Sequence, residues 1–158
     1  MSHAEMPRPN PTDAPSTPTL PRMLIRDVMT HQSESVRPSD SVRAVAQVMQ
    51  VRDVGFLPVV EDERVLGVVT DRDLTLRATA AGLDPTQTTV ADVMTSEVFY
   101  CFDDEDVAAA TFLMETKGVR RLVVFDRKMH LTGVLSIDDL SAIPGGAQSV
   151  GRTLRRLT

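Results

Sequence analysis

Two short stretches of the chain place a hydroxyl and a carboxylate three residues apart, directly after an apolar run. Thr70 and Asp73 stand in the first stretch, and Ser136 and Asp139 stand in the second. An apolar run of this kind predicts a strand that leads straight into a helix, with both polar side chains on the first helical turn. A helix N-terminus attracts anions, and a carboxylate accepts hydrogen bonds from two adjacent hydroxyls. The spacing therefore predicts sites for a ribose phosphate.

The same spacing also describes a capping box. In that alternative Thr70 caps the helix and Asp73 reaches back to it, with no ligand involved. The two hypotheses differ in the expected effect of substituting Asp73. If the residues form a ligand site, the substitution abolishes ligand binding; if they form only a capping box, it lowers stability and nothing else.

The two stretches belong to a tandem duplication. Asp27-Val28-Met29-Thr30 recurs 65 residues later as Asp92-Val93-Met94-Thr95. The offset holds without a gap until one residue is inserted near Thr132, after which Asp73 matches Asp139. A sustained offset of this kind indicates two copies of one structural unit.

Each repeat predicts a short strand, a helix, a strand hairpin and a second helix, which makes the fold class α/β (α+β) with two β-α-β-β-α repeats. A unit of this size has little core of its own, so the repeats should pack together with pseudo-two-fold symmetry. The first helix of each repeat is expected to begin at a polar cap, Ser39-Asp40 or Asp103-Asp104, and to bury an apolar face. In the first repeat that face comprises Val42, Val45, Ala46 and Met49.

Composition sets the domain boundaries and excludes several classes of protein. The first residues are rich in Pro, which predicts a disordered tail. The expected divisions are the tail at 1–22, the first repeat at 23–80, a linker at 81–90, the second repeat at 91–142, and a C-terminal tail with a short helix at 143–158. No apolar run is long enough for a membrane helix, and no signal peptide is evident, which favours a cytoplasmic protein.

Charge and residue counts narrow the function further. The 158 residues carry a net charge of −5, which disfavours a nucleic-acid binder, although the arginines near the C-terminus leave a DNA-associated regulator as an alternative. His31 and His130 are isolated, so no metal site is expected. Cys101 lies in a predicted strand and is expected to be a small buried hydrophobe rather than a redox sensor. Because no nucleophile–base pair is evident, catalysis is not expected.

The duplicated stretches at 55–60, 67–74, 118–124 and 133–140 resemble, in their order and spacing, a tandem pair of CBS domains, also called a Bateman module. The resemblance covers about 25–142 and is similar to stand-alone bacterial members in which the pair is the whole protein. It implies a non-catalytic sensor that binds an adenine nucleotide (AMP, ADP or ATP) in the cleft between the repeats. It also implies a homodimer, shaped as a four-repeat disc, that signals through a conformational or dimer change to a protein partner.

The resemblance also implies roles for single residues. Ribose would be held by Thr70 and Asp73 in one cleft and by Ser136 and Asp139 in the other. Phosphates would be met by Arg120 and Arg121, which would face the Thr70/Asp73 cleft, since an arginine donates two hydrogen bonds at once. The remaining expected contacts are Arg72 to phosphate and Thr30, Val36 and Pro58 to the adenine ring.

An asymmetry between the clefts follows from this assignment. Gly55 and Phe56 stand where the second repeat has Arg120 and Arg121, so the Ser136/Asp139 cleft is expected to lack a phosphate clamp and to suit an adenosine-like ligand or none. Two alternatives stay open. In the first, Arg120 and Arg121 lie on a solvated strand edge and bind no phosphate. In the second, the whole protein is a ligand-free structural or interaction module.

Overall fold

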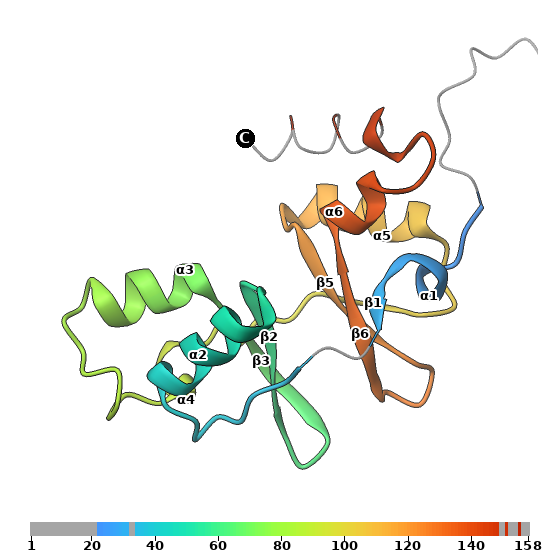
Figure 1. Ribbon diagram of the computed structural model, residues 1–158. Coiled ribbons are helices and arrows are strands. Elements are labelled where there is room, and N and C mark those ends of the chain that lie inside the picture. Colours follow the sequence, from blue (N-terminus) through green and yellow to red (C-terminus); the bar gives the residue numbers. More distant parts are fainter. Residues whose placement is uncertain (1–21, 32–33, 149–150, 152–154, 156–158) are drawn as a thin grey trace, which may run out of the picture.

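The computed structural model describes residues 22–31, 34–148, 151 and 155. The predicted tail at 1–22, apart from Arg22, and most of the predicted C-terminal helix lie outside these residues. The chain forms two lobes, each a small sheet with helices beside it (Figure 1).

The first lobe contains a two-stranded antiparallel sheet. β2 (Phe56–Glu61) pairs with β3 (Arg64–Thr70), and Val36 adds a parallel bridge to Val59 at the free edge of β2. Its helices are α2 (Val42–Arg52), α3 (Asp71–Asp73), the π-helix η2 (Leu74–Thr79) that continues α3, and α4 (Val90–Val93). The helix, the strand hairpin and the second helix follow in the predicted order, whereas α4 and the π-helical turn were not predicted.

The second lobe contains a four-stranded sheet in the order β1-β6-β5-β4. β5 pairs antiparallel with β6 and parallel with β4. The strands are β1 (Thr30–His31), β4 (Tyr100–Phe102), β5 (Arg121–Phe125) and β6 (Leu131–Ser136). The helices are α1 (Ile25–Val28), α5 (Val107–Lys117) and α6 (Ile137–Ser141).

The segment that leads into each repeat packs on the lobe of the other repeat. Thr30, near the start of the first repeat, pairs with Val134 on β6, and Thr95, near the start of the second, bridges to Val68 on β3. Ile25 is fully buried in the core of the second lobe. Each lobe therefore needs both halves of the chain, which explains why neither repeat has a complete core of its own.

Two glycines allow these crossings. A Cβ atom at Gly67 would lie 2.6 Å from the carbonyl oxygen of Thr95, and a Cβ atom at Gly133 would overlap the carbonyl oxygen of Thr30. Only a residue without a side chain lets the leading segment lie this close to the strand. These glycines thereby hold Thr95 and Thr30 beside the ends of β3 and β6.

The long helices begin at residues other than the predicted caps. The hydroxyl of Ser41 accepts a hydrogen bond from the N–H of Ala44, and the carboxylate of Asp106 accepts one from Ala108. The expectation of Ser39-Asp40 and Asp103-Asp104 was wrong because the cap lies directly before the first helical residue. Asp40 instead accepts a hydrogen bond from the N–H of Arg37 and closes the preceding turn.

The predicted apolar faces form the cores of the lobes. Val42, Val45 and Met49 on α2 are buried, but Ala46 is exposed, so that part of the predicted face was wrong. A third cluster joins the lobes, where Val68 from β3 packs with Val123 and Phe125 from β5. The two sheets thus share apolar contacts along the surface where the repeats meet.

Candidate functional site

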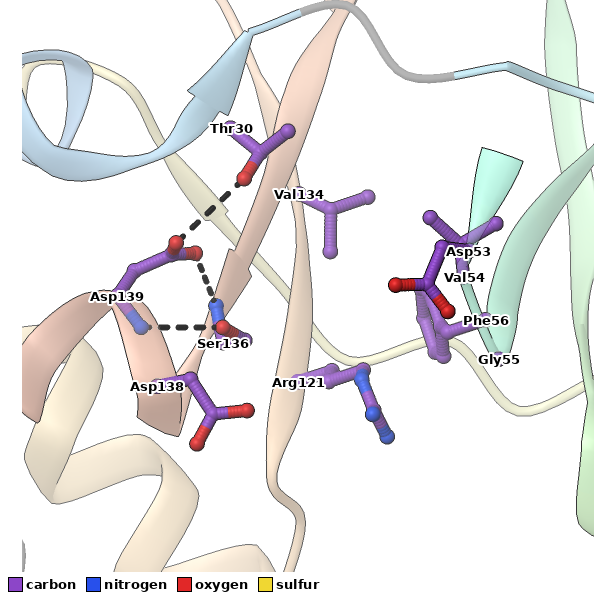
Figure 2. Close-up of a pocket in the computed structure, with 10 residues that line it drawn as sticks. All are labelled: Thr30, Asp53, Val54, Gly55, Phe56, Arg121, Val134, Ser136, Asp138 and Asp139. Carbon is purple, nitrogen blue, oxygen red and sulfur yellow. Dashed lines mark hydrogen bonds between the residues drawn. The ribbon is translucent and has the colours of Figure 1, made fainter. Parts of the chain in front are cut away.

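A pocket of about 190 Å³ lies where the two lobes meet (Figure 2). The second lobe contributes the end of β6, the start of α6, β1 and the first residue of β5. The first lobe contributes the turn between α2 and β2. The lining residues are Thr30, Asp53, Val54, Gly55, Phe56, Arg121, Val134, Ser136, Asp138 and Asp139.

Ser136 and Asp139 form one wall of this pocket through a complete capping box. The N–H of Asp139 donates to the Ser136 hydroxyl over 3.1 Å, and the N–H of Ser136 donates to Oδ2 of Asp139 over 2.8 Å. The hydroxyl of Thr30 donates to Oδ1 of Asp139 over a long 3.4 Å (Figure 2). The cap therefore employs mainly one carboxylate oxygen and leaves Oδ1 with only a weak partner.

Thr70 and Asp73 form the matching capping box in the first lobe, but their surroundings differ. Asp73 is 9% exposed. Besides the N–H of Thr70, its carboxylate accepts the hydroxyl of Thr95 on both oxygens, at 3.2 and 3.3 Å. The guanidinium of Arg77 lies 3.8 Å from Oδ1. Asp73 is thus more deeply buried and more fully engaged than Asp139.

The observed geometry is therefore compatible with both hypotheses for the hydroxyl–carboxylate spacing, the capping box and the ligand site. The capping box is present in both repeats, since Thr70 and Ser136 each cap a helix and each carboxylate reaches back. The cap leaves further acceptor capacity on each carboxylate. In the first lobe protein groups occupy that capacity, and in the second lobe it faces a pocket.

Arg121 lies in the pocket of Ser136 and Asp139. It begins β5 directly opposite Ser136 on β6. An adjoining pocket of about 180 Å³ shares Arg121 and Ser136 and adds Arg120. The sequence analysis expected no phosphate clamp in this cleft, but the cross-strand pairing brings the start of β5, and with it Arg121, to the end of β6. No hydrogen bond or ion pair joins Arg120 or Arg121 to Thr70 or Asp73 within the described ranges, so that pairing stays a prediction.

The other predicted contacts are divided between the lobes. Thr30 lines the pocket and bonds Asp139. Val36 is 5% exposed in the core of the first lobe, and its N–H donates to the carbonyl of the buried Pro58. The structure thus separates Val36 and Pro58 from Thr30, and core packing accounts for Val36. Arg72 is exposed and lines a separate surface pocket on α3.

The sequence analysis did not identify most of the residues that the first lobe contributes to the lining of this pocket. Asp53 and Val54 directly follow α2, and Phe56 begins β2. Asp53 adopts a left-handed conformation with φ 52°. The duplication held a signal for Phe56, because it occupies the position of Arg121 in the other repeat. Asp138 was also missed, although it lies between Ser136 and Asp139.

The pocket is mixed in charge and has an apolar wall. Asp53, Asp138 and Asp139 supply carboxylates, Arg121 supplies one guanidinium, and Val134 supplies apolar surface. Such a lining suits a small polar molecule that has one planar apolar part. Three carboxylates against one arginine disfavour a ligand with many negative charges.

The remaining chemically active side chains are in structural positions. Burial, assisted by Glu105, raises the pKa of the Cys101 thiol to about 12, as expected for a buried hydrophobe. Nε2 of His31 lies 2.7 Å from the carbonyl oxygen of Arg26, and His130 pairs with Asp126. Among the described residues no group of three or more His, Cys, Asp or Glu side chains is arranged to hold a metal ion. None of the helices in the described ranges has the length and apolar character to span a membrane.

Comparisons with known proteins agree on one family. The family model for the CBS domain matches residues 25–78 and 90–144. The chain is 34% identical over 134 residues to the CBS domain-containing protein YhcV of Bacillus subtilis, covering 85% of this chain and 94% of that protein. It is 31% identical over 117 residues to hypoxic response protein 1 of Mycobacterium tuberculosis, covering 73% of this chain and 81% of that protein.

Solved structures share the fold. The crystal structure of hypoxic response protein I, which holds two coordinated zinc ions, matches with a TM-score of 0.69 at 30% identity, covering 77% of this chain and all of that one. A CBS domain protein of Pyrobaculum aerophilum, PAE2072, was solved in complex with AMP. It matches with a TM-score of 0.69 at 24% identity, covering 82% of this chain and 99% of that one. At that identity the likeness concerns the fold alone.

Proposed function

This chain belongs to the CBS domain family, and from that premise we propose that it is a non-catalytic regulatory module that binds an adenine nucleotide between its two lobes. The observation that carries the proposal is the carboxylate of Asp139, which faces a pocket with one oxygen weakly engaged and with Arg121 in the same pocket. The relative solved with AMP supports the ligand class.

The ligand is oriented by the polar wall. The ribose hydroxyls donate to Oδ1 of Asp139, where they compete only with the long hydrogen bond from Thr30. The base lies against Val134 and Phe56, and the phosphate extends toward Arg121 and the adjoining pocket of Arg120. A guanidinium binds phosphate with paired hydrogen bonds, which makes the two arginines suitable for this role.

The charge and the volume of the two adjoining pockets determine how many phosphates the bound nucleotide carries. Asp53 and Asp138 repel additional negative charge, and each pocket is smaller than the roughly 300–1,000 Å³ of ordinary ligand sites. AMP or adenosine therefore binds more tightly than ADP or ATP. Thr70 and Asp73 form the weaker cleft in this proposal.

Binding acts as a signal because the ligand touches both lobes. Phe56 and Asp53 belong to the first lobe, whereas Asp139 and Arg121 belong to the second. A ligand held by both lobes stabilises one relative packing over others, and a second site or partner responds to that shift. In this proposal the protein acts in the cytoplasm on a protein target.

A homodimer is part of the proposal. α5 carries apolar residues on its outer face as well as its inner face, and Phe112 is 70% exposed there. On α2, Val51 is 78% exposed. A helix that is apolar all round is normally buried, which favours a second copy of the chain as the cover.

Analytical ultracentrifugation tests the homodimer. The wild type is expected to sediment as a dimer and Phe112→Asp as a monomer, and a monomeric wild type contradicts the proposed dimer.

A thermal-shift titration of the full chain with AMP, ADP, ATP, adenosine and S-adenosylmethionine tests the ligand. A ligand that binds only the folded state raises Tm with concentration. We expect AMP to raise Tm of the wild type and not of Asp139→Asn, which keeps an oxygen for the cap. If no compound raises Tm, the ligand-free structural alternative is favoured, since both capping boxes are complete without a ligand.

A further inference from the structure

Arg77 joins three groups around the carboxylate of the first lobe. Its Nε lies 3.8 Å from Oδ1 of Asp73. Its Nη1 donates to the carbonyl of Met94 over 2.9 Å and to that of Val93 over 3.3 Å. One side chain therefore connects the helix that follows β3 with the end of α4.

The π-helix η2 carries Arg77. The N–H of Ala80 donates to the carbonyl of Thr75, five residues back, which widens the helical turn. Arg77 follows Asp73 by four residues, so both lie on one face of the helix. π-Helical turns often occur at functional sites, where they displace side chains from regular positions.

Groups of the protein itself surround the carboxylate of Asp73. Met94, which accepts from Arg77, is followed by Thr95, whose hydroxyl donates to both oxygens of Asp73. The N–H of Thr70 supplies a further donor. Asp73 thus accepts hydrogen bonds from a backbone N–H and a hydroxyl and has a cation 3.8 Å away, while it is 9% exposed.

The second repeat lacks this arrangement. Ile143 stands at the position that corresponds to Arg77, and it is 5% exposed within the core of the second lobe. In the described part of the chain no cation forms an ion pair with Asp139. The two carboxylates are equivalent in the duplication, but only Asp73 has a counter-ion supplied by its own repeat.

We propose that Arg77 is a built-in counter-ion that closes the first cleft, so that each chain takes one ligand, at Asp139. This inference rests on the proposed function. A ribose hydroxyl at Asp73 has to displace the hydroxyl of Thr95, and it competes with the charge of Arg77, whose guanidinium lies 3.8 Å from the carboxylate. At Asp139 the hydroxyl has only to replace the long bond from Thr30.

The test is the number of AMP molecules bound per chain, measured by isothermal titration calorimetry on the full chain. Wild type is expected to bind one AMP and Arg77→Met two, because methionine keeps an unbranched apolar stem but provides no charge or donor. Arg77→Lys, which keeps the charge, is expected to bind one. Ile143→Met is the matched control at the equivalent position and is expected to bind one.

Two further variants locate the ligands. Asp139→Asn is expected to abolish binding in the wild-type background and to leave one AMP in the Arg77→Met background. One AMP in both wild type and Arg77→Met, or two in wild type, overturns the role of Arg77 and leaves the proposed function intact. If no variant binds AMP, both fail. Should Arg77→Met unfold, as circular dichroism would reveal, Arg77→Leu replaces it with the same expectations, because leucine also provides no charge or donor.

Discussion

The guanidinium carbon of Arg121 lies 5.9 Å from the centre of the Phe56 ring. These two residues hold the same position in the two repeats, 65 residues apart. Equivalent residues can meet only where the two repeats face each other, so this contact marks the approximate two-fold axis. Because both residues line the pocket of Asp139, a ligand there is in reach of both repeats.

Arg121→Ala is expected to weaken AMP binding about tenfold, the equivalent of roughly 1.4 kcal/mol for a lost charged hydrogen bond. Adenosine, which has no phosphate, should bind the variant and the wild type equally. Calorimetric titration with both compounds measures the difference. Arg72→Ala is the control, since Arg72 lies in a separate surface pocket. An equal loss for adenosine and AMP would assign Arg121 a merely structural role.

The two equivalent carboxylates should differ in their effect on stability. Asp73→Asn is expected to lower the free energy of unfolding by about 2 kcal/mol, since it weakens several hydrogen bonds of a buried group. Asp139→Asn should cost less than about 1 kcal/mol, since the cap keeps an acceptor. Urea denaturation of the two variants checks the order, and a larger cost at Asp139 would refute the difference in their surroundings.

Gly133→Ala is expected to displace Thr30 from β6, because the new methyl group would overlap the carbonyl of Thr30. Overpacking of this kind costs about 2 kcal/mol. The displacement should also weaken AMP binding, since Thr30 borders the pocket. Gly67→Ala is the matched control: it crowds Thr95 in the first lobe and should lower Tm without affecting AMP affinity. The account is contradicted if Gly133→Ala binds AMP like the wild type.

The thiol of Cys101 should be unreactive in the folded protein. Burial raises its pKa to about 12 from an ordinary value of 9.0. At pH 8 a thiol reagent should label the protein only after urea is added. Since the unfolded chain loses this proton first, the free energy of unfolding should fall as the pH rises from about 9 to about 12. Cys101→Ala removes this contribution, and fast labelling of the folded protein would disprove it.

The sequence permits accurate prediction of the repeats, the two strand hairpins and the motifs that end β3 and β6. The duplication identifies Thr70 and Ser136 as equivalent, and the Gly-Val runs before them predict strands that lead into helices. These features depend on local spacing, which the sequence states directly. The cap at Ser41 lies directly after the predicted pair Ser39-Asp40, because several polar residues precede the helix and only the backbone geometry decides which one caps it.

The arrangement of the repeats could not be predicted in the same way. A duplication shows which residues are equivalent, but not which lobe a segment joins. The pairing of Thr30 with Val134 places the start of the chain on the second lobe, and the pairing of Arg121 with Ser136 brings an arginine to the second cleft. Arg77 was overlooked although its spacing of four residues from Asp73 was a signal. Its other partners, the backbone carbonyls of Val93 and Met94, are revealed by no residue type.

A crystal structure of the full chain grown with AMP is the most direct test of the central claim. The account predicts one AMP per chain, with a ribose hydroxyl within hydrogen-bond distance of Oδ1 of Asp139 and the phosphate beside Arg121. A ribose bound to Asp73 instead, with the Asp139 pocket empty, would contradict it. So would crystals grown at saturating AMP that show no nucleotide in either cleft.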